Sequence, residues 1–142
     1  MRNKPLTVAA GPVVVVDEDP DTARRVAGSL IAWYLCAMGD VYSRSVSAQG
    51  YAAAVQAIQS ANPRPRPGDG VVPPEAKPVI EQFAAYGDAR QVRDQLAPWD
   101  AVVDIVLITP PPGLAWESLE DTLRAAAPSA ELSALSVQRA ES

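Results

Sequence analysis

Residues 13–30 read VVVVDEDPDTARRVAGSL, and this stretch decides the class of fold. Four valines in succession are typical of a strand that is buried on both faces, as the strands of parallel sheets are. From Ala23 to Met38 apolar residues then recur at helical spacing and form one continuous face. A buried strand that leads directly into an amphipathic helix predicts an α/β protein.

The acids between this strand and this helix, Asp17, Glu18 and Asp19, admit three interpretations. An acidic pair after a first strand resembles the magnesium site of a two-component receiver domain, but residues 51–67, where the phosphoacceptor strand belongs, have the pattern of helix and loop. An independent metal site needs carboxylates that converge, whereas adjacent residues diverge. The third interpretation makes Asp19 the N-cap of the helix and places Pro20 at its first position. We adopt this one, while noting that in a β/α barrel the same junction lies on the catalytic face.

Composition narrows the functional classes. The chain of 142 residues fits one domain, and its net charge of −5 argues against nucleic acid or an anionic membrane as partner. The single cysteine, Cys36, cannot form an internal disulfide, and the absence of histidine removes Ser-His and Cys-His nucleophiles. The apolar run 30–39 is about half the length of a membrane span. We therefore expect a cytoplasmic protein that binds neither nucleic acid nor membrane.

The remaining pattern predicts two parallel strands, at 6–16 and 102–109, separated by a predominantly helical insertion. Gly11-Pro12 indicates either a bulge in the first strand or a strand that begins at Val13. Helices are expected at 23–38, 41–48, 51–61, 75–86, 88–97 and 116–126. Residues 129–142 are small and polar, and we expect them to form a flexible C-terminal tail behind a single domain of residues 1–128.

Residues 62–74, NPRPRPGDGVVPP, contain five prolines and two glycines. Such a composition excludes helix and strand and predicts an extended loop. A proline-rich ligand for another module is the alternative, and a connecting loop is the preferred interpretation.

Several stretches taken in order resemble the C-terminal part of the luciferase-like flavin- or deazaflavin-dependent oxidoreductases. The match rests on four segments: GPVVVVDEDPDTARRVA, LIAWYLCAMGDVYSRSVSAQGYAAAVQAI, VVPPEAKPVIEQFAAYGDARQVRDQL and DIVLITPPPG. The resemblance as a whole extends over residues 8–128, nearly the whole chain. Members of that family are TIM barrels, so the resemblance implies the C-terminal portion of a (β/α)₈ barrel. This chain departs from the family at residues 87–90, which read Gly-Asp-Ala-Arg where the family usually has Gly-Thr-Pro-Glu.

The resemblance implies a monooxygenase or oxidoreductase acting on paired donors, with coenzyme F-420 (a deazaflavin) or FMN as cofactor. A complete barrel needs eight strands and about 250 residues, and most cofactor contacts in the family come from strands that precede this part. We therefore expect no catalytic residue and no metal site here, and no tight cofactor binding. The barrel-mouth candidates are Asp17 and Glu18 after the first strand, and Thr109 and Gly113 after the second.

Four aromatic residues could either stack on a flavin ring or pack in the core: Trp33, Tyr34, Tyr42 and Tyr51. Their helical spacing favours packing in the core. Cys36 lies on the same apolar helix face and is interpreted as core filler. A fragment of a barrel leaves apolar surface without a cover, which predicts self-association or pairing with a separate barrel part. The alternative function is therefore a non-catalytic interaction or oligomerisation module.

Overall fold

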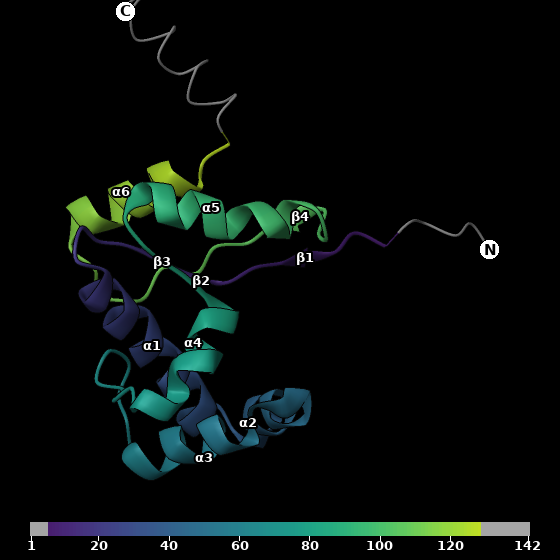
Figure 1. Cartoon of the computed structure of the whole chain (residues 1–142), viewed down its shortest axis with the longest axis vertical. Coiled ribbons are helices and arrows are strands. Elements are labelled where there is room, and N and C mark those ends of the chain that lie inside the picture. Colours follow the sequence, from purple (N-terminus) through teal and green to yellow (C-terminus); the bar gives the residue numbers. More distant parts are fainter. Residues whose placement is uncertain (1–5, 129–142) are drawn as a thin grey trace, which may run out of the picture.

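A computed structural model describes residues 6–128 and shows a mixed α/β fold with parallel strands (Figure 1). Strand β1 (Ala9–Ala10) pairs with β4 (Ile105–Val106), and β2 (Val13–Val16) pairs with β3 (Ala84–Gly87). A parallel bridge between Val13 and Thr109 joins the two ladders. The predicted α/β class is confirmed. The tail expected at 129–142 lies outside the described residues.

The strand segment 9–16 lies in the centre, because β3 flanks it on one side and residues 105–109 flank it on the other. Gly11-Pro12 divides this segment into β1 and β2, as the sequence suggested. Gly11 has a second function, since a Cβ there would lie 1.8 Å from the carbonyl oxygen of Leu107. Only glycine therefore lets residues 105–109 approach this closely.

Val14, Val15 and Val16 of β2 are buried and Val13 is partly buried, so the strand is covered on both faces as predicted. Val15 belongs to a core cluster beneath α1 (Pro20–Ala37), whereas Val14 and Val16 belong to a second cluster beneath α5 (Ala89–Asp100) and α6 (Trp116–Ala126). This division follows from the alternation of side chains along a strand. Figure 1 shows α5 and α6 on one side of the strands and α1 on the other.

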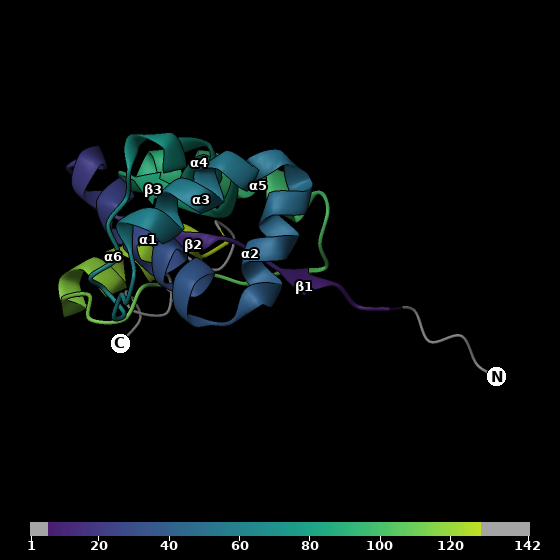
Figure 2. The ribbon, with the colours of Figure 1, turned by 90° about the horizontal axis from the view of Figure 1, so that it is seen from below.

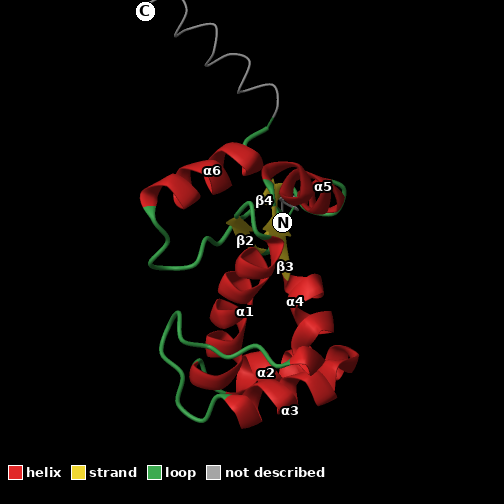
Figure 3. Ribbon diagram, turned by 60° about the vertical axis from the view of Figure 1, so that its left-hand side comes forward, coloured by secondary structure: helices red, strands yellow, loops and turns green. Residues whose placement is uncertain are grey.

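The helical insertion packs on the same face of the sheet as α1. It consists of α2 (Asp40–Val46), a π-helical turn (Ser47–Tyr51), α3 (Ala52–Ala61), a 3₁₀ turn (Pro74–Ala76) and α4 (Lys77–Phe83). Helices α1 and α4 pack against each other, and α3 packs against both (Figure 3). Helices α2 and α3, furthest from the strands in Figure 1, lie in front in Figure 2.

Two expectations from the sequence are wrong. Residues 84–87, AAYG, form strand β3 and not the end of a helix over 75–86, so the chain has more than the two strands expected. Their pairing with the valines of β2 outweighs the high helix propensity of alanine. The strand expected at 102–109 begins only at Ile105, and residues 101–104 form a turn and a bend before it.

The order of the strands in space is 84–87, then 9–16, then 105–109. In a TIM barrel each strand lies beside the one that follows it in the chain, whereas here the third strand segment lies beside the first. Residues 6–128 show no barrel, and with α1 on one face and α5 and α6 on the other they form a small parallel sheet that is covered on both faces. Its strand order reverses between the central segment and residues 105–109.

Candidate functional site

An open crevice of about 920 Å³ lies at the carboxyl end of the central strand, beside the point where the strand order reverses. In open α/β sheets this is the usual place for a ligand. Three segments form its walls: the first turns of α1, the loop 68–72, and residues 111–118 that lead into α6. The lining residues are Asp17, Asp21, Thr22, Arg24, Arg25, Val26, Ser29, Leu30, Gly68, Asp69, Gly70, Val71, Val72, Pro111, Pro112, Gly113, Leu114, Ala115 and Ser118.

The first wall begins where β2 ends. The carboxylate of Asp17 accepts a hydrogen bond from the backbone N–H of Asp19 at 2.9 Å, and the Asp17 N–H donates to the carbonyl of Gly87 at 2.9 Å. These bonds fix Asp17 between the ends of β2 and β3. Along α1 the side chains of Asp21, Arg25 and Ser29 follow at intervals of four residues, so they line one face of the helix.

The predicted N-cap is confirmed. The Asp19 carboxylate accepts bonds from the N–H of Asp21 at 3.2 Å and from the hydroxyl of Thr22 at 2.7 Å. The Thr22 hydroxyl and the Asp21 amide hold the pKa of Asp19 below its ordinary 3.8. Asp21 in turn pairs with Arg24 at 3.0 Å. Arg25 has no ion pair within residues 6–128, so its charge is available to a ligand.

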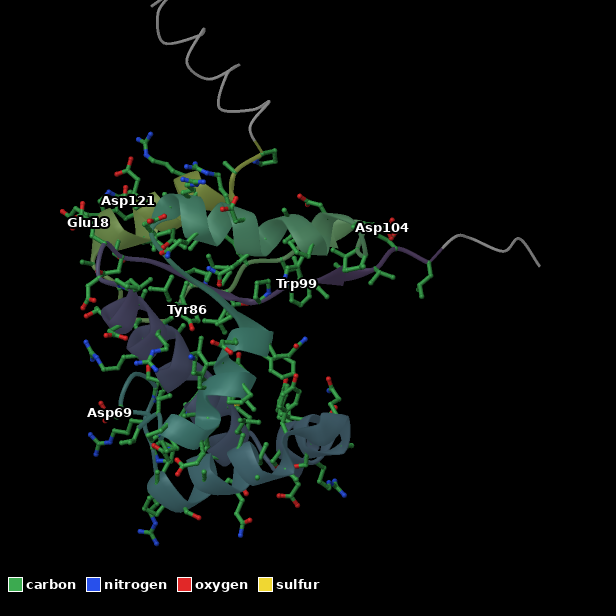
Figure 4. All side chains as sticks on the ribbon, viewed as in Figure 1. Glu18, Asp69, Tyr86, Trp99, Asp104 and Asp121 are labelled. Carbon is green, nitrogen blue, oxygen red and sulfur yellow. The ribbon has the colours of Figure 1, made fainter. Side chains whose placement is uncertain are left out.

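The second wall is the loop that the sequence identified only as a connection. Asn62 is buried, and its side-chain amide donates to the carbonyl of Val71 at 2.8 Å and accepts from the N–H of Val71 at 2.7 Å. A Cβ on Gly70 would lie 2.4 Å from the carbonyl oxygen of Ser29. The loop therefore lies directly on α1. Figure 4 shows Asp69 on this loop beside the helix.

The third wall is held by two hydroxyl groups. Ser118 donates to the carbonyl of Val16 at 3.1 Å, and Thr122, which is fully buried, accepts from the N–H of Val16 at 3.1 Å. These bonds attach α6 to the end of β2. Gly113 has a φ of 84°, a left-handed conformation that favours glycine, and it turns the chain from the strand into the helix.

The lining combines both signs of charge with hydroxyl groups and an apolar floor. The carboxylates come from Asp17, Asp21 and Asp69, the guanidinium groups from Arg24 and Arg25, and the apolar contacts from residues such as Val26, Leu30, Val72 and Leu114. Such a surface suits a small molecule that has a charged or hydroxylated part and an apolar part.

The structure brings together two of the four mouth candidates. Asp17 and Gly113 line the crevice. Glu18 is exposed outside it, near Asp121 in Figure 4, and Thr109 uses its backbone to pair with Pro12 and Val14. The Arg25 side chain and the loop 68–72 were missed. Gly68-Asp69-Gly70 is a turn signal, but nothing local indicates that the turn lies against α1.

The aromatic residues lie away from the crevice. Tyr34 and Tyr42 line a second, smaller pocket of about 380 Å³ between α1, α2 and the strands, which Thr109 also lines. Their ring centroids are 5.5 Å apart in an edge-to-face arrangement, and Tyr34 contacts Trp33 in the same way at 5.2 Å. Tyr51 packs against the core as expected, whereas Tyr42 is exposed.

Cys36 packs against the core cluster beneath α1, in agreement with its interpretation as core filler. Burial raises the pKa of its thiol above the ordinary 9.0, so little reactive thiolate forms near neutral pH.

Among residues 6–128, no group of three His, Cys, Asp or Glu side chains is arranged to hold a metal ion. Over the same residues, each helix is too short or too polar to cross a membrane.

Comparison of the chain with models of protein families, with curated proteins and with solved structures returns no match. The class of protein is therefore defined by its fold and its crevice alone. It is a small α/β protein of parallel strands, with a polar crevice at their carboxyl ends.

Proposed function

We propose that this chain is a ligand-binding unit of a luciferase-like flavin- or deazaflavin-dependent oxidoreductase, and that the ligand enters the crevice beside Asp17. The observation that carries the proposal is that Asp17 and Gly113, chosen as mouth residues, line one crevice although 96 positions separate them. The carboxyl ends of parallel strands are the face on which β/α enzymes bind their substrates.

The crevice fits part of such a cofactor. Its volume of about 920 Å³ is ample for a small molecule, and Arg25 can donate to a phosphate. The hydroxyl groups of Thr22, Ser29 and Ser118 already donate within the protein, so their oxygens can accept hydrogen bonds from a polyol. Its lining includes no aromatic side chain against which a tricyclic ring would stack. When bound, a flavin or deazaflavin supplies hydride transfer or, in the case of flavin, oxygen activation.

The strand order limits the proposal to binding. Residues 105–109 lie beside the central strand and not beside β3. The support for ligand binding therefore comes from the crevice and from the resemblance, and no closed barrel is assumed. A site that lacks a surface for the ring would hold either cofactor weakly. We therefore propose millimolar affinity for the chain alone, and no catalytic step is assigned to its residues.

Equilibrium titration of FMN and of coenzyme F-420 tests this proposal. Arg25→Ala should weaken the binding of both by removing the free guanidinium, whereas Arg93→Ala, which removes an exposed arginine of α5, should leave it unchanged. Equal affinity in the wild type and Arg25→Ala would refute the placement of the ligand. Saturable micromolar binding would show instead that the site is complete.

A second candidate function, an interaction or oligomerisation module, is favoured by a separate observation. Ile105 and Leu107 lie on the strand at the margin of the sheet, and their exposed fractions are 51% and 50%. Half-exposed aliphatic side chains along one strand are a feature of surfaces that bind another chain.

A further inference from the structure

The two margins of the sheet differ in how their backbone groups are satisfied. On the outer side of β3, the side chain of Gln95 accepts from the N–H of Tyr86 at 3.2 Å and donates to its carbonyl at 2.8 Å. This amide takes the place of a neighbouring strand. Another chain cannot pair with Tyr86 unless it first displaces Gln95.

The margin formed by residues 105–109 has no such cover. The N–H groups of Ile105, Leu107 and Thr109 point inward and donate to the carbonyls of Val8, Ala10 and Pro12. Backbone groups alternate along a strand, so those of Val106 and Ile108 point outward. Within residues 6–128 their outward N–H and C=O groups make no hydrogen bond.

The side chains alternate in the same way. Val106 and Ile108 pack against the core cluster beneath α5 and α6, whereas Ile105 and Leu107 are half-exposed on the other face. The margin thus has unsatisfied backbone groups and an uncovered apolar row, the two features that promote pairing between strands. Asp104 is the only charged residue within 102–109, and its carboxylate already accepts a bond from the Val8 N–H at 2.8 Å.

We propose that this margin pairs with the same margin of a second copy, antiparallel, about a two-fold axis at Leu107. In this register Val106 lies opposite Ile108 of the other copy, and each such pair exchanges two backbone hydrogen bonds. Leu107 lies opposite its own counterpart at a position without hydrogen bonds, where side chains approach most closely. An edge strand meets itself in a closed dimer only in this antiparallel, isologous manner.

Charge and area point to a dimer of a particular kind. With the axis at Leu107, Asp104 lies opposite Pro110 of the other copy, so the strands place no like charges together even though each chain carries −5. A stable interface buries about 1,200–2,000 Å² in total, which a five-residue margin with two half-exposed side chains does not reach. We therefore infer a weak, concentration-dependent dimer. This inference deepens the interaction role and is independent of the crevice.

Sedimentation equilibrium of the full chain over a wide concentration range tests the dimer. The weight-average mass of the wild type should rise from 15.0 kDa toward twice that value. Leu107→Lys should remain at the monomer mass, because it places a charge beside its own counterpart. The matched control is Leu123→Lys, which changes a leucine of similar exposure (46%) on α6 and should associate like the wild type.

Hydrogen exchange gives a second readout that does not require a variant. The amides of Val106 and Ile108 should become more protected as concentration rises, whereas the amide of Tyr86 should not change. A wild type that stays monomeric at every concentration would overturn the proposal. So would a Leu107→Lys variant that retains its native circular dichroism and associates as the wild type does.

Discussion

The side-chain amide of Asn62 makes both hydrogen bonds of the Val71 backbone, and by doing so it fixes the loop that forms one wall of the crevice. The same amide nitrogen also donates to the carbonyl of Ile58 at 2.8 Å, so the loop is tied to the end of α3. A loop rich in proline and glycine has few backbone bonds of its own. Asn62 therefore contributes to the position of the loop together with the contacts of Gly70 and Val72 with α1.

Asn62→Ala should destabilise the protein by about 1–3 kcal/mol, because it removes both partners of the part-buried Val71 backbone and the amide donor to the Ile58 carbonyl. Denaturant unfolding measures the change. Proteolysis within 64–70 should become faster in the variant as the loop leaves α1. Gln59→Ala, which removes an exposed side chain with one long bond of 3.4 Å to Leu35, should cost much less. Equal effects of the two substitutions would contradict the account.

The N-cap gives a prediction with a defined pH window. Hydrogen bonds from Thr22 and Asp21 hold the pKa of Asp19 below 3.8, so the folded state binds this proton less readily than the unfolded state. The stabilisation is therefore present above pH 3.8 and is lost as pH falls through the folded-state value.

Asp19→Ala should lower the thermal midpoint at neutral pH, and its difference from the wild type should shrink well below pH 3.8. Thermal unfolding at the two pH values measures this. Glu18→Ala removes an exposed neighbouring acid that makes no hydrogen bond within residues 6–128, and it is the control. A difference between Asp19→Ala and the wild type that persists unchanged in acid would mean that the ionised cap is not its source.

The contact between Gly11 and Leu107 predicts a steric effect. Gly11→Ala should destabilise the protein by at least about 1–3 kcal/mol, because the added methyl would overlap the Leu107 carbonyl and separate β1 from residues 105–109. The neighbouring substitution Ala10→Gly removes a methyl and should cost only about 0.5–1 kcal/mol. Chemical denaturation compares the two. A Gly11→Ala protein as stable as the wild type would show that the strands do not approach this closely.

Tyr86 predicts a loss of stability in alkali. Burial raises the pKa of its hydroxyl above 10.0, and the negative charge of Glu81 adds to the shift. The unfolded chain ionises near pH 10.0 while the folded state resists, so stability should decline as pH rises above that value. Tyr86→Phe should lose less stability between pH 9 and pH 11 than the wild type does. Parallel stability curves for the two proteins would contradict this.

The parts of the fold that are set by local pattern could be predicted from the sequence. The valines of β2, the cap at Asp19 and the helical face that begins at Ala23 each follow from neighbouring residues. Strand β3 could not be predicted, because Ala84 and Ala85 favour helix when alone and become a strand only by pairing with residues some seventy positions earlier.

The lining of the crevice, like the fold, could be predicted from the sequence only in part. Asp17 and Gly113 follow the ends of strands and were found on that basis. Arg25 and Gly70 could not be recognised from the sequence. Arg25 looks like any exposed arginine on a helix, and Gly70 looks like any glycine in a turn. They line one crevice only because the loop 68–72 packs against α1. Their contribution depends on tertiary contacts that no short segment encodes.

The central claim is that a ligand binds in the crevice between α1, the loop 68–72 and the start of α6. Titration of isotope-labelled protein with FMN, followed by the shifts of its amide resonances, tests this most directly because it locates even millimolar binding. The account predicts that the largest shifts occur at Gly68, Gly70, Gly113 and Ser118. Shifts centred instead on Tyr34 and Tyr42, which line the second pocket, or no shifts at millimolar FMN, would contradict it.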